Sequence, residues 1–106
     1  SIIDGNSNVT GMLVTSSDTC NVRGDLELMD SGYIHLEYMQ KDVDVSDGDM
    51  IVTSNISDKY IQGILIGYVK NITEDANSLT QSGYLVPAVD FERLTEVLVI
   101  MQLKKK

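Results

Sequence analysis

The chain has 106 residues, 42% of them hydrophobic, and a formal net charge of −8. This length allows one domain around one core, and the apolar content is typical of a folded domain rather than a disordered chain. The negative charge repels nucleic acid phosphates and anionic membranes, so we expect no nucleic acid partner and no membrane contact from this segment itself. Its longest apolar runs are also too short to cross a bilayer.

Short runs of alternating apolar residues follow one another along the chain and predict β-strands. In chain order, these residues are Met12 and Val14; Leu26 and Leu28; Ile34, Leu36 and Tyr38; Ile64, Ile66 and Tyr68; Leu85 and Val89; and Val97, Val99 and Met101. Stretches rich in Asp, Asn, Ser and Gly separate the runs and predict turns.

The order of these elements indicates the fold class. Residues 89–96 can form one helical turn, and Pro87 suits a strand edge or the break just before that turn. We therefore expect an all-β fold over residues 1–106, namely a small antiparallel six- to seven-stranded β-barrel with at most one short helical turn.

The segment Asp30-Ser31-Gly32 has two interpretations. Retropepsin-like proteases are all-β chains of similar length in which two subunits each supply one Asp-Thr/Ser-Gly, and residues 64–67 are similar to their apolar-apolar-Gly element. The chain would then be an aspartic protease homodimer that uses Asp30 to activate water. However, Tyr33 stands where those proteases need a small residue, and Asp, Ser and Gly are common hairpin residues. We expect a hairpin turn and keep the protease as the alternative.

The aspartates of residues 42–49 suggest a calcium loop. An EF-hand loop that begins at Asp42 needs Gly at its sixth position and Glu at its twelfth, where the chain has Asp47 and Thr53. We interpret Asp47-Gly48 instead as a turn before a strand, with solvated carboxylates.

The single cysteine and the single histidine do not indicate a site. Cys20 has no disulfide partner within the chain and no clustered ligands, so we expect a small, buried or half-buried side chain. His35 alternates with Ile34 and Leu36, so we expect it on the outward face. We predict no catalytic residue, no metal site and no cofactor.

From Tyr38 onward, the chain resembles the C-terminal part of the MreC family of bacterial rod-shape-determining proteins. The family pattern has Gly-Asp before an apolar strand that ends in Thr-Ser, then G(I/L)xIGxV, a Pro-Ala-Val-Asp-Phe-like run and a final LxxVLVI strand. Residues 48–54, 63–69 and 87–100 match this pattern in order. The chain departs from it at Asn55, where the family has Gly, and before Gly63, where the family often has Pro.

The resemblance implies a non-enzymatic scaffold of cell-wall elongation. Proteins of this family bind the class B penicillin-binding transpeptidase of the elongation complex, act alongside MreD and RodA, and self-associate as full-length proteins. The chain would be a fragment of a longer protein, anchored by an N-terminal membrane helix, and would lie on the extracytoplasmic face of the bacterial cell membrane. We expect Tyr60 and Ile61 to bind a partner. A generic small-barrel binding module is a further alternative.

Overall fold

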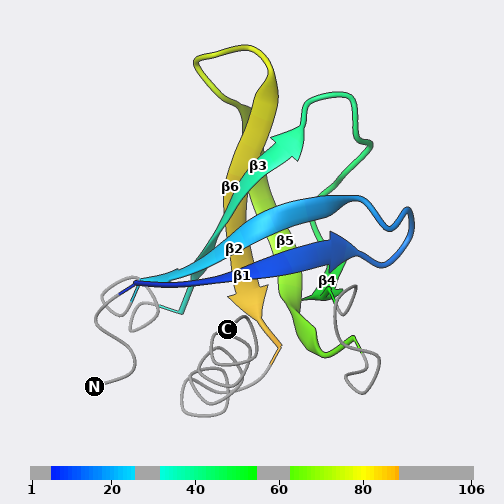
Figure 1. Cartoon of the computed structure of the whole chain (residues 1–106), viewed down its shortest axis with the longest axis vertical. Coiled ribbons are helices and arrows are strands. Elements are labelled where there is room, and N and C mark those ends of the chain that lie inside the picture. The colour runs from blue at the N-terminus through cyan, green and yellow to red at the C-terminus, as the bar shows by residue number, and fades with distance from the viewer. Residues whose placement is uncertain (1–5, 26–31, 55–62, 89–106) are drawn as a thin grey trace.

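The computed structural model describes residues 6–25, 32–54 and 63–88, and every regular element in these ranges is a β-strand. The six strands close into one antiparallel barrel in the order β1-β2-β3-β6-β5-β4, with β4 pairing again to β1 (Figure 1). Their bounds are β1 Asn6–Leu13, β2 Thr19–Asp25, β3 Ile34–Gln40, β4 Met50–Thr53, β5 Leu65–Glu74 and β6 Thr80–Pro87. The predicted all-β barrel is confirmed.

Several predicted elements lie outside the described residues. They are the helical turn of residues 89–96, the final strand around residues 97–101 and the alternating pair Leu26 and Leu28. Pro87 is the last residue of β6, as predicted for a residue that cannot donate to a strand ladder. Within the described ranges, no helix is long and apolar enough to cross a membrane.

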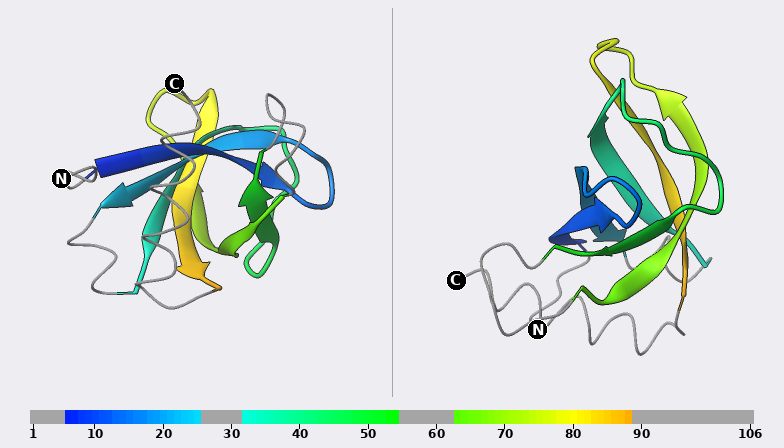
Figure 2. Two further views of the ribbon diagram at one scale, coloured as in Figure 1. Left: turned by 60° about the horizontal axis from the view of Figure 1, so that its bottom comes forward. Right: turned by 90° about the vertical axis from the view of Figure 1, so that its right-hand side faces the viewer.

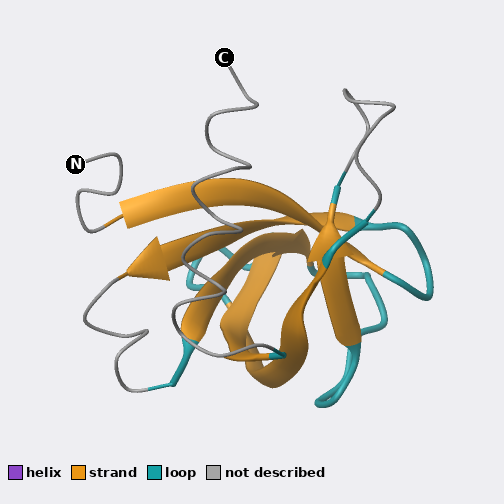
Figure 3. Ribbon diagram, turned by 90° about the horizontal axis from the view of Figure 1, so that it is seen from below, coloured by secondary structure: helices purple, strands orange, loops and turns teal. Residues whose placement is uncertain are grey.

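The core fills the inside of the barrel, and every strand contributes buried residues to it. Strict alternation fails in β5, where Ile66 and Gly67 are both buried at an irregularity in the pairing with β4, so Tyr68, expected on the face of Ile66, is instead 38% exposed. Seen from below, the strands form a ring around this interior (Figure 3), and the right-hand view of Figure 2 shows the β5–β6 hairpin projecting beyond the other strands. The buried apolar residues are Val9, Leu13, Cys20, Val22, Ile34, Leu36, Met39, Ile51, Ile66, Val69 and Leu85. Burial of this apolar surface is the main source of stability in such a domain.

The alternating run Ile34, Leu36 and Tyr38 predicted one shared face for these three residues, and this is wrong for Tyr38, because a β-bulge reverses the alternation in β3. Leu36 pairs with Gly83 and Met39 with Gln81, so two residues of β3 lie opposite one residue of β6. Tyr38 has a φ of 62° and is 63% exposed, whereas Met39 is fully buried. The extra residue therefore moves the inward position from Tyr38 to Met39.

A second bulge lies on the other side of β6. Lys70 pairs with Tyr84 and Thr73 with Ser82, so Asn71 and Ile72 both lie opposite Gly83. Asn71 has a φ of 58°, a conformation that Asn tolerates better than most residues. A Cβ atom at Gly83 would lie 2.8 Å from the Asn71 carbonyl oxygen, so this close approach requires glycine.

Strand β4 begins and ends at positions of the family pattern. Gly48, with a φ of 93°, forms the turn before it, and the Gly48 N–H donates to the Val69 carbonyl at 2.8 Å. At its other end, the buried Thr53 hydroxyl accepts the Ile64 N–H at 2.8 Å. These two contacts fix the short strand between β1 and β5.

Candidate binding surface

The residues predicted to bind a partner, Tyr60 and Ile61, lie outside the described residues, as does Asp30 of the protease hypothesis. Strands β2 and β3 pair antiparallel, with Arg23 opposite His35. The Asp-Ser-Gly segment therefore connects two neighbouring antiparallel strands, as the hairpin interpretation requires.

The acidic turn is tied to the backbone rather than arranged around a cation. The Ser46 N–H donates to Asp49 Oδ2 at 2.9 Å, and the Asn71 N–H donates to Asp47 Oδ1 at 3.0 Å. Two of the four carboxylates thus stabilise the turn before β4 and the bulge of β5. Within residues 6–25, 32–54 and 63–88, no group of three or more His, Cys, Asp or Glu residues could hold a metal ion.

Cys20 is buried on β2, in agreement with the prediction. Burial raises the pKa of its thiol from 9.0 to about 12, because the thiolate would lose its hydration in the core. The nucleophilic form is therefore scarce at neutral pH.

His35 is half-buried on the outward side of β3, also as predicted, since its neighbours Ile34 and Leu36 are both buried. Its ring centroid lies 5.8 Å from that of Tyr84 on β6.

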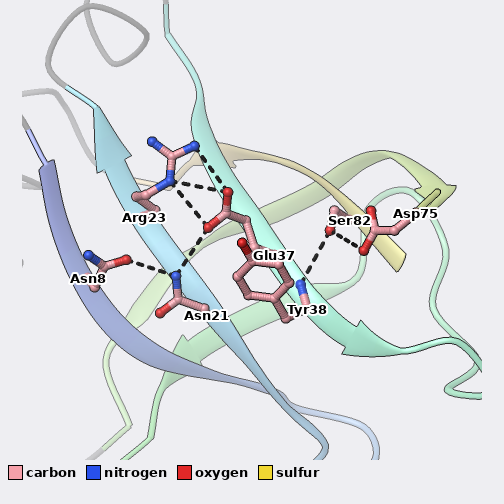
Figure 4. A network of polar contacts seen from close by, with 7 residues as sticks. All are labelled: Asn8, Asn21, Arg23, Glu37, Tyr38, Asp75 and Ser82. Atoms are coloured by element: carbon pink, nitrogen blue, oxygen red, sulfur yellow. Dashed lines mark hydrogen bonds and ion pairs between the residues drawn. The ribbon is translucent and has the colours of Figure 1, made fainter. Parts of the chain in front are cut away.

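The outer face of β1, β2 and β3 carries a polar network (Figure 4). Arg23 donates from Nε and Nη2 to the Glu37 carboxylate at 3.1 to 3.2 Å. Asn21 donates from Nδ2 to Asn8 Oδ1 at 2.8 Å and to Glu37 Oε1 at 3.3 Å. The Arg23 and Glu37 charges neutralise each other through this bidentate contact. The polar side chains of this outer face are therefore held mainly by one another.

A second chain of hydrogen bonds holds the bulge of β3 (Figure 4). The Tyr38 N–H donates to Ser82 Oγ at 3.3 Å, and the Ser82 hydroxyl donates to Asp75 Oδ2 at 2.9 Å. The Thr80 hydroxyl also donates to this carboxylate. Together they connect β3 to the β5–β6 hairpin and keep the Tyr38 ring outside the barrel.

The outer face of β1, β4, β5 and β6 is different, because large apolar side chains lie next to one another across the strands. Met50 pairs with Tyr68, and Tyr68 pairs with Val86. The Val14 N–H donates to the Met50 carbonyl at 3.2 Å, which extends the series to the end of β1. We call Val14, Met50, Tyr68 and Val86 the apolar row; their exposed fractions are between 38% and 46%.

The sequence contains a signal for only part of the apolar row. Residues 50–52 are apolar without interruption, so β4, which begins at Met50, has apolar side chains on both faces. The inward side chains fill the core, whereas the outward apolar side chains stay exposed and can contact another molecule. Adjacent exposed apolar side chains of this kind are typical of protein interaction sites.

Comparison with known proteins identifies the family. A family model for the barrel core of rod shape-determining protein MreC matches residues 1–101. The cell shape-determining proteins MreC of Bacillus subtilis (strain 168) and Geobacillus stearothermophilus are each 39% identical over 57 residues, which is 54% of this chain and 20% of the relative.

The protein of the same name from Listeria monocytogenes is 28% identical over 109 residues, which is 91% of this chain and 37% of the relative. The chain thus spans well under half the length of these curated relatives. No solved structure matches. Since the family model covers nearly the whole chain and the described strands form a closed barrel, the chain belongs to the MreC family of cell shape-determining proteins and contains its barrel core.

Proposed function

We propose that this barrel is a non-enzymatic scaffold of cell-wall elongation. Its partner is the class B penicillin-binding transpeptidase of the elongation complex, with MreD and RodA in the same assembly and self-association of the full-length protein. The parent protein is anchored by a membrane helix, and the barrel lies on the extracytoplasmic face. Family membership supports this role, and the apolar row is the observation that carries the proposed contact.

The apolar row suits a protein partner for two reasons. Three of its residues come from the neighbouring strands β4, β5 and β6, and Val14 directly follows β1, so the partner meets a surface held by the barrel and little order is lost on binding. Tyr68 lies at its centre, and tyrosine is enriched among the residues that dominate binding energies at protein interfaces. A scaffold of this kind acts by stabilising one conformation of the transpeptidase.

Calorimetric titration of the chain with the extracellular part of the transpeptidase from the same organism tests this proposal. We expect micromolar or tighter binding by the wild type. Met50→Glu should weaken it about tenfold or more, because it places a charge in the apolar contact. Leu79→Glu is a matched control, since Leu79 is 66% exposed on the β5–β6 turn and lies outside the row.

The two results that would contradict the proposal are distinct. If Met50→Glu folds normally and binds as tightly as the Leu79→Glu control, the apolar row is not the contact. If the wild-type chain gives no heat at several temperatures, the barrel core does not bind the transpeptidase directly.

Tyr60 and Ile61 remain predicted partner contacts. In the same titration, Ile61→Asp should lower the affinity for the transpeptidase while leaving the melting temperature unchanged. A folded Ile61→Asp variant that binds like the wild type would remove this loop from the proposed interface.

A further inference from the structure

A surface hollow lies on the outer side of the barrel, where β3, β6 and β5 run together. Its volume is about 180 Å³, and it is lined by His35, Asn71, Thr73, Ser82, Gly83 and Tyr84. The two bulges flank β6 at Ser82 and Gly83, so the hollow lies where the regular pairing of three strands is interrupted. Bulges are over-represented next to functional sites, where they re-aim side chains.

Aromatic rings form one side of the hollow. The His35 and Tyr84 ring centroids lie 5.8 Å apart, and Tyr33 meets Tyr84 edge-to-face at 6.1 Å. Lys70 Nζ lies over the Tyr33 ring, 5.6 Å from its centroid. These contacts hold the Tyr84 ring in place, and a fixed ring offers an apolar face at a low entropic cost.

The other side chains that line the hollow, those of Asn71, Thr73 and Ser82, are polar. The Ser82 hydroxyl is already used by Tyr38 and Asp75. By contrast, the Asn71 carboxamide and the Thr73 hydroxyl make no hydrogen bond with the part of the chain that the structure describes. The carboxamide offers donors and an acceptor, and the hydroxyl offers one donor and acceptor sites.

We propose that this hollow binds one acetamido-sugar unit of a glycan strand. The C–H face of a pyranose ring is apolar and can pack against an aromatic ring, which here is the ring of Tyr84. The acetamido group has one N–H donor and one carbonyl acceptor, which complement the Asn71 carboxamide, and a ring hydroxyl complements Thr73.

The site shares no lining residue with the apolar row, although Tyr84 and Val86 are neighbours on the outer face of β6. It is also smaller than the cavities of roughly 300 Å³ or more that enclose drug-sized ligands. We therefore expect it to hold a single sugar ring, with a Kd in roughly the millimolar range.

An NMR titration of the ¹⁵N-labelled chain tests the proposal. The probe is chitotetraose, a soluble tetramer of β-1,4-linked N-acetylglucosamine, and the comparison probe is cellotetraose, which has the same linkage without acetamido groups. We expect saturable shifts at Asn71, Thr73 and Tyr84 with chitotetraose and at least about fivefold weaker binding of cellotetraose, because it lacks the acetamido hydrogen bonds.

Three variants assign the contacts. Tyr84→Ala should weaken chitotetraose binding about tenfold, and Thr73→Val about threefold. Asn71→Gly should also weaken it about threefold while retaining the positive φ of this position. Tyr38→Ala is the matched control, because it removes an exposed tyrosine from the same strand region but not from the hollow, and its affinity should equal that of the wild type.

The proposal is overturned if chitotetraose causes no saturable shifts, or if the shifts lie away from the hollow. Equal binding of the two tetramers would overturn the assignment to acetamido sugars. A folded Tyr84→Ala variant with wild-type affinity would overturn the aromatic contact. Since the titration contains no protein partner, none of these results bears on the transpeptidase contact.

Discussion

The β1–β2 hairpin and the β3–β6–β5 region of the same barrel are built differently. Strands β1 and β2 pair without interruption from Asn6–Asp25 to Met12–Thr19. Strand β6, in contrast, has a bulge in each of its two partners, at positions next to one another. The uninterrupted hairpin has its outer side chains tied to each other and to β3, whereas the bulged region carries the aromatic cluster and the hollow.

The comparison shows that regular strand pairing maintains the core of this fold, whereas bulges change which side chains reach its surface. A regular ladder keeps strict alternation, so every second residue belongs to the core. A bulge costs regular hydrogen bonds, but it re-aims a side chain without opening the barrel. Tyr38 is the clear case, because one extra residue moves a large ring from the predicted core face to the solvent.

The largest expected effect at neutral pH comes from truncating the two side chains that the first bulge places on opposite faces. Met39→Ala should lower the free energy of unfolding by about 3 kcal/mol, because it leaves a cavity in the core. Tyr38→Ala should lower it by less than about 0.5 kcal/mol, because the ring is exposed. Urea denaturation of both variants measures this difference, and the reverse order of costs would show that Tyr38 faces inward.

The second bulge is tested at Gly83. Gly83→Ala should cost about 2 kcal/mol, because the new methyl group meets the Asn71 carbonyl oxygen and the Ile72 side chain. Gly83→Val should cost more, since its two additional methyl groups must fit the same space. Thermal melting measures both, and a Gly83→Ala variant as stable as the wild type would argue against the close approach of β5 and β6.

The titration of Cys20 tests whether solvent reaches the core side of the β1–β2 hairpin. Because burial raises its pKa from 9.0 to about 12, the unfolded chain releases the thiol proton before the folded chain does. Stability from this group is complete below pH 9 and falls between pH 9 and 12, by about 1.4 kcal/mol per pH unit at most.

The measurement is urea denaturation at several pH values above 9, with Cys20→Ala as the reference that lacks this titration. We expect the wild type to lose stability more steeply than the variant. Parallel pH dependence of the two proteins would mean that the thiol is accessible to solvent in the folded state.

The smallest expected effect comes from the hydrogen bonds that hold the β3 bulge. Ser82→Ala removes the acceptor of the Tyr38 N–H and a donor to Asp75, and should cost about 1 kcal/mol. Amide hydrogen exchange should speed up at Tyr38 in this variant and stay unchanged in the β1–β2 hairpin. Faster exchange at both places would indicate a global loss of stability instead.

The sequence predicted the part of the fold that follows alternation and turn chemistry. The barrel class, the Asp47-Gly48 turn, the strand end at Pro87, the outward His35 and the buried Cys20 all rest on local patterns, and the structure agrees with them.

The position of Tyr38 could not be predicted in the same way. A bulge is set by how two distant strands pair, and no pattern within β3 distinguishes Tyr38 from Met39 as the inward residue. The hollow was not predicted for the same reason, because its lining comes from three strands that are brought together only by the barrel topology. The apolar row had a local signal, but the signal says only that both faces are apolar.

Closure of the barrel has a consequence for how its surface can change over time. Each of the six described strands has a hydrogen-bonded neighbour on both sides along at least part of its length, although β1 pairs with β4 only over Gly11–Leu13. Where the ladder is closed, it offers no backbone edge to a foreign strand, so contacts with another molecule there are made by side chains. Such contacts can be altered one substitution at a time while the ladder beneath them stays intact, so specificity can diverge between species without a change of architecture.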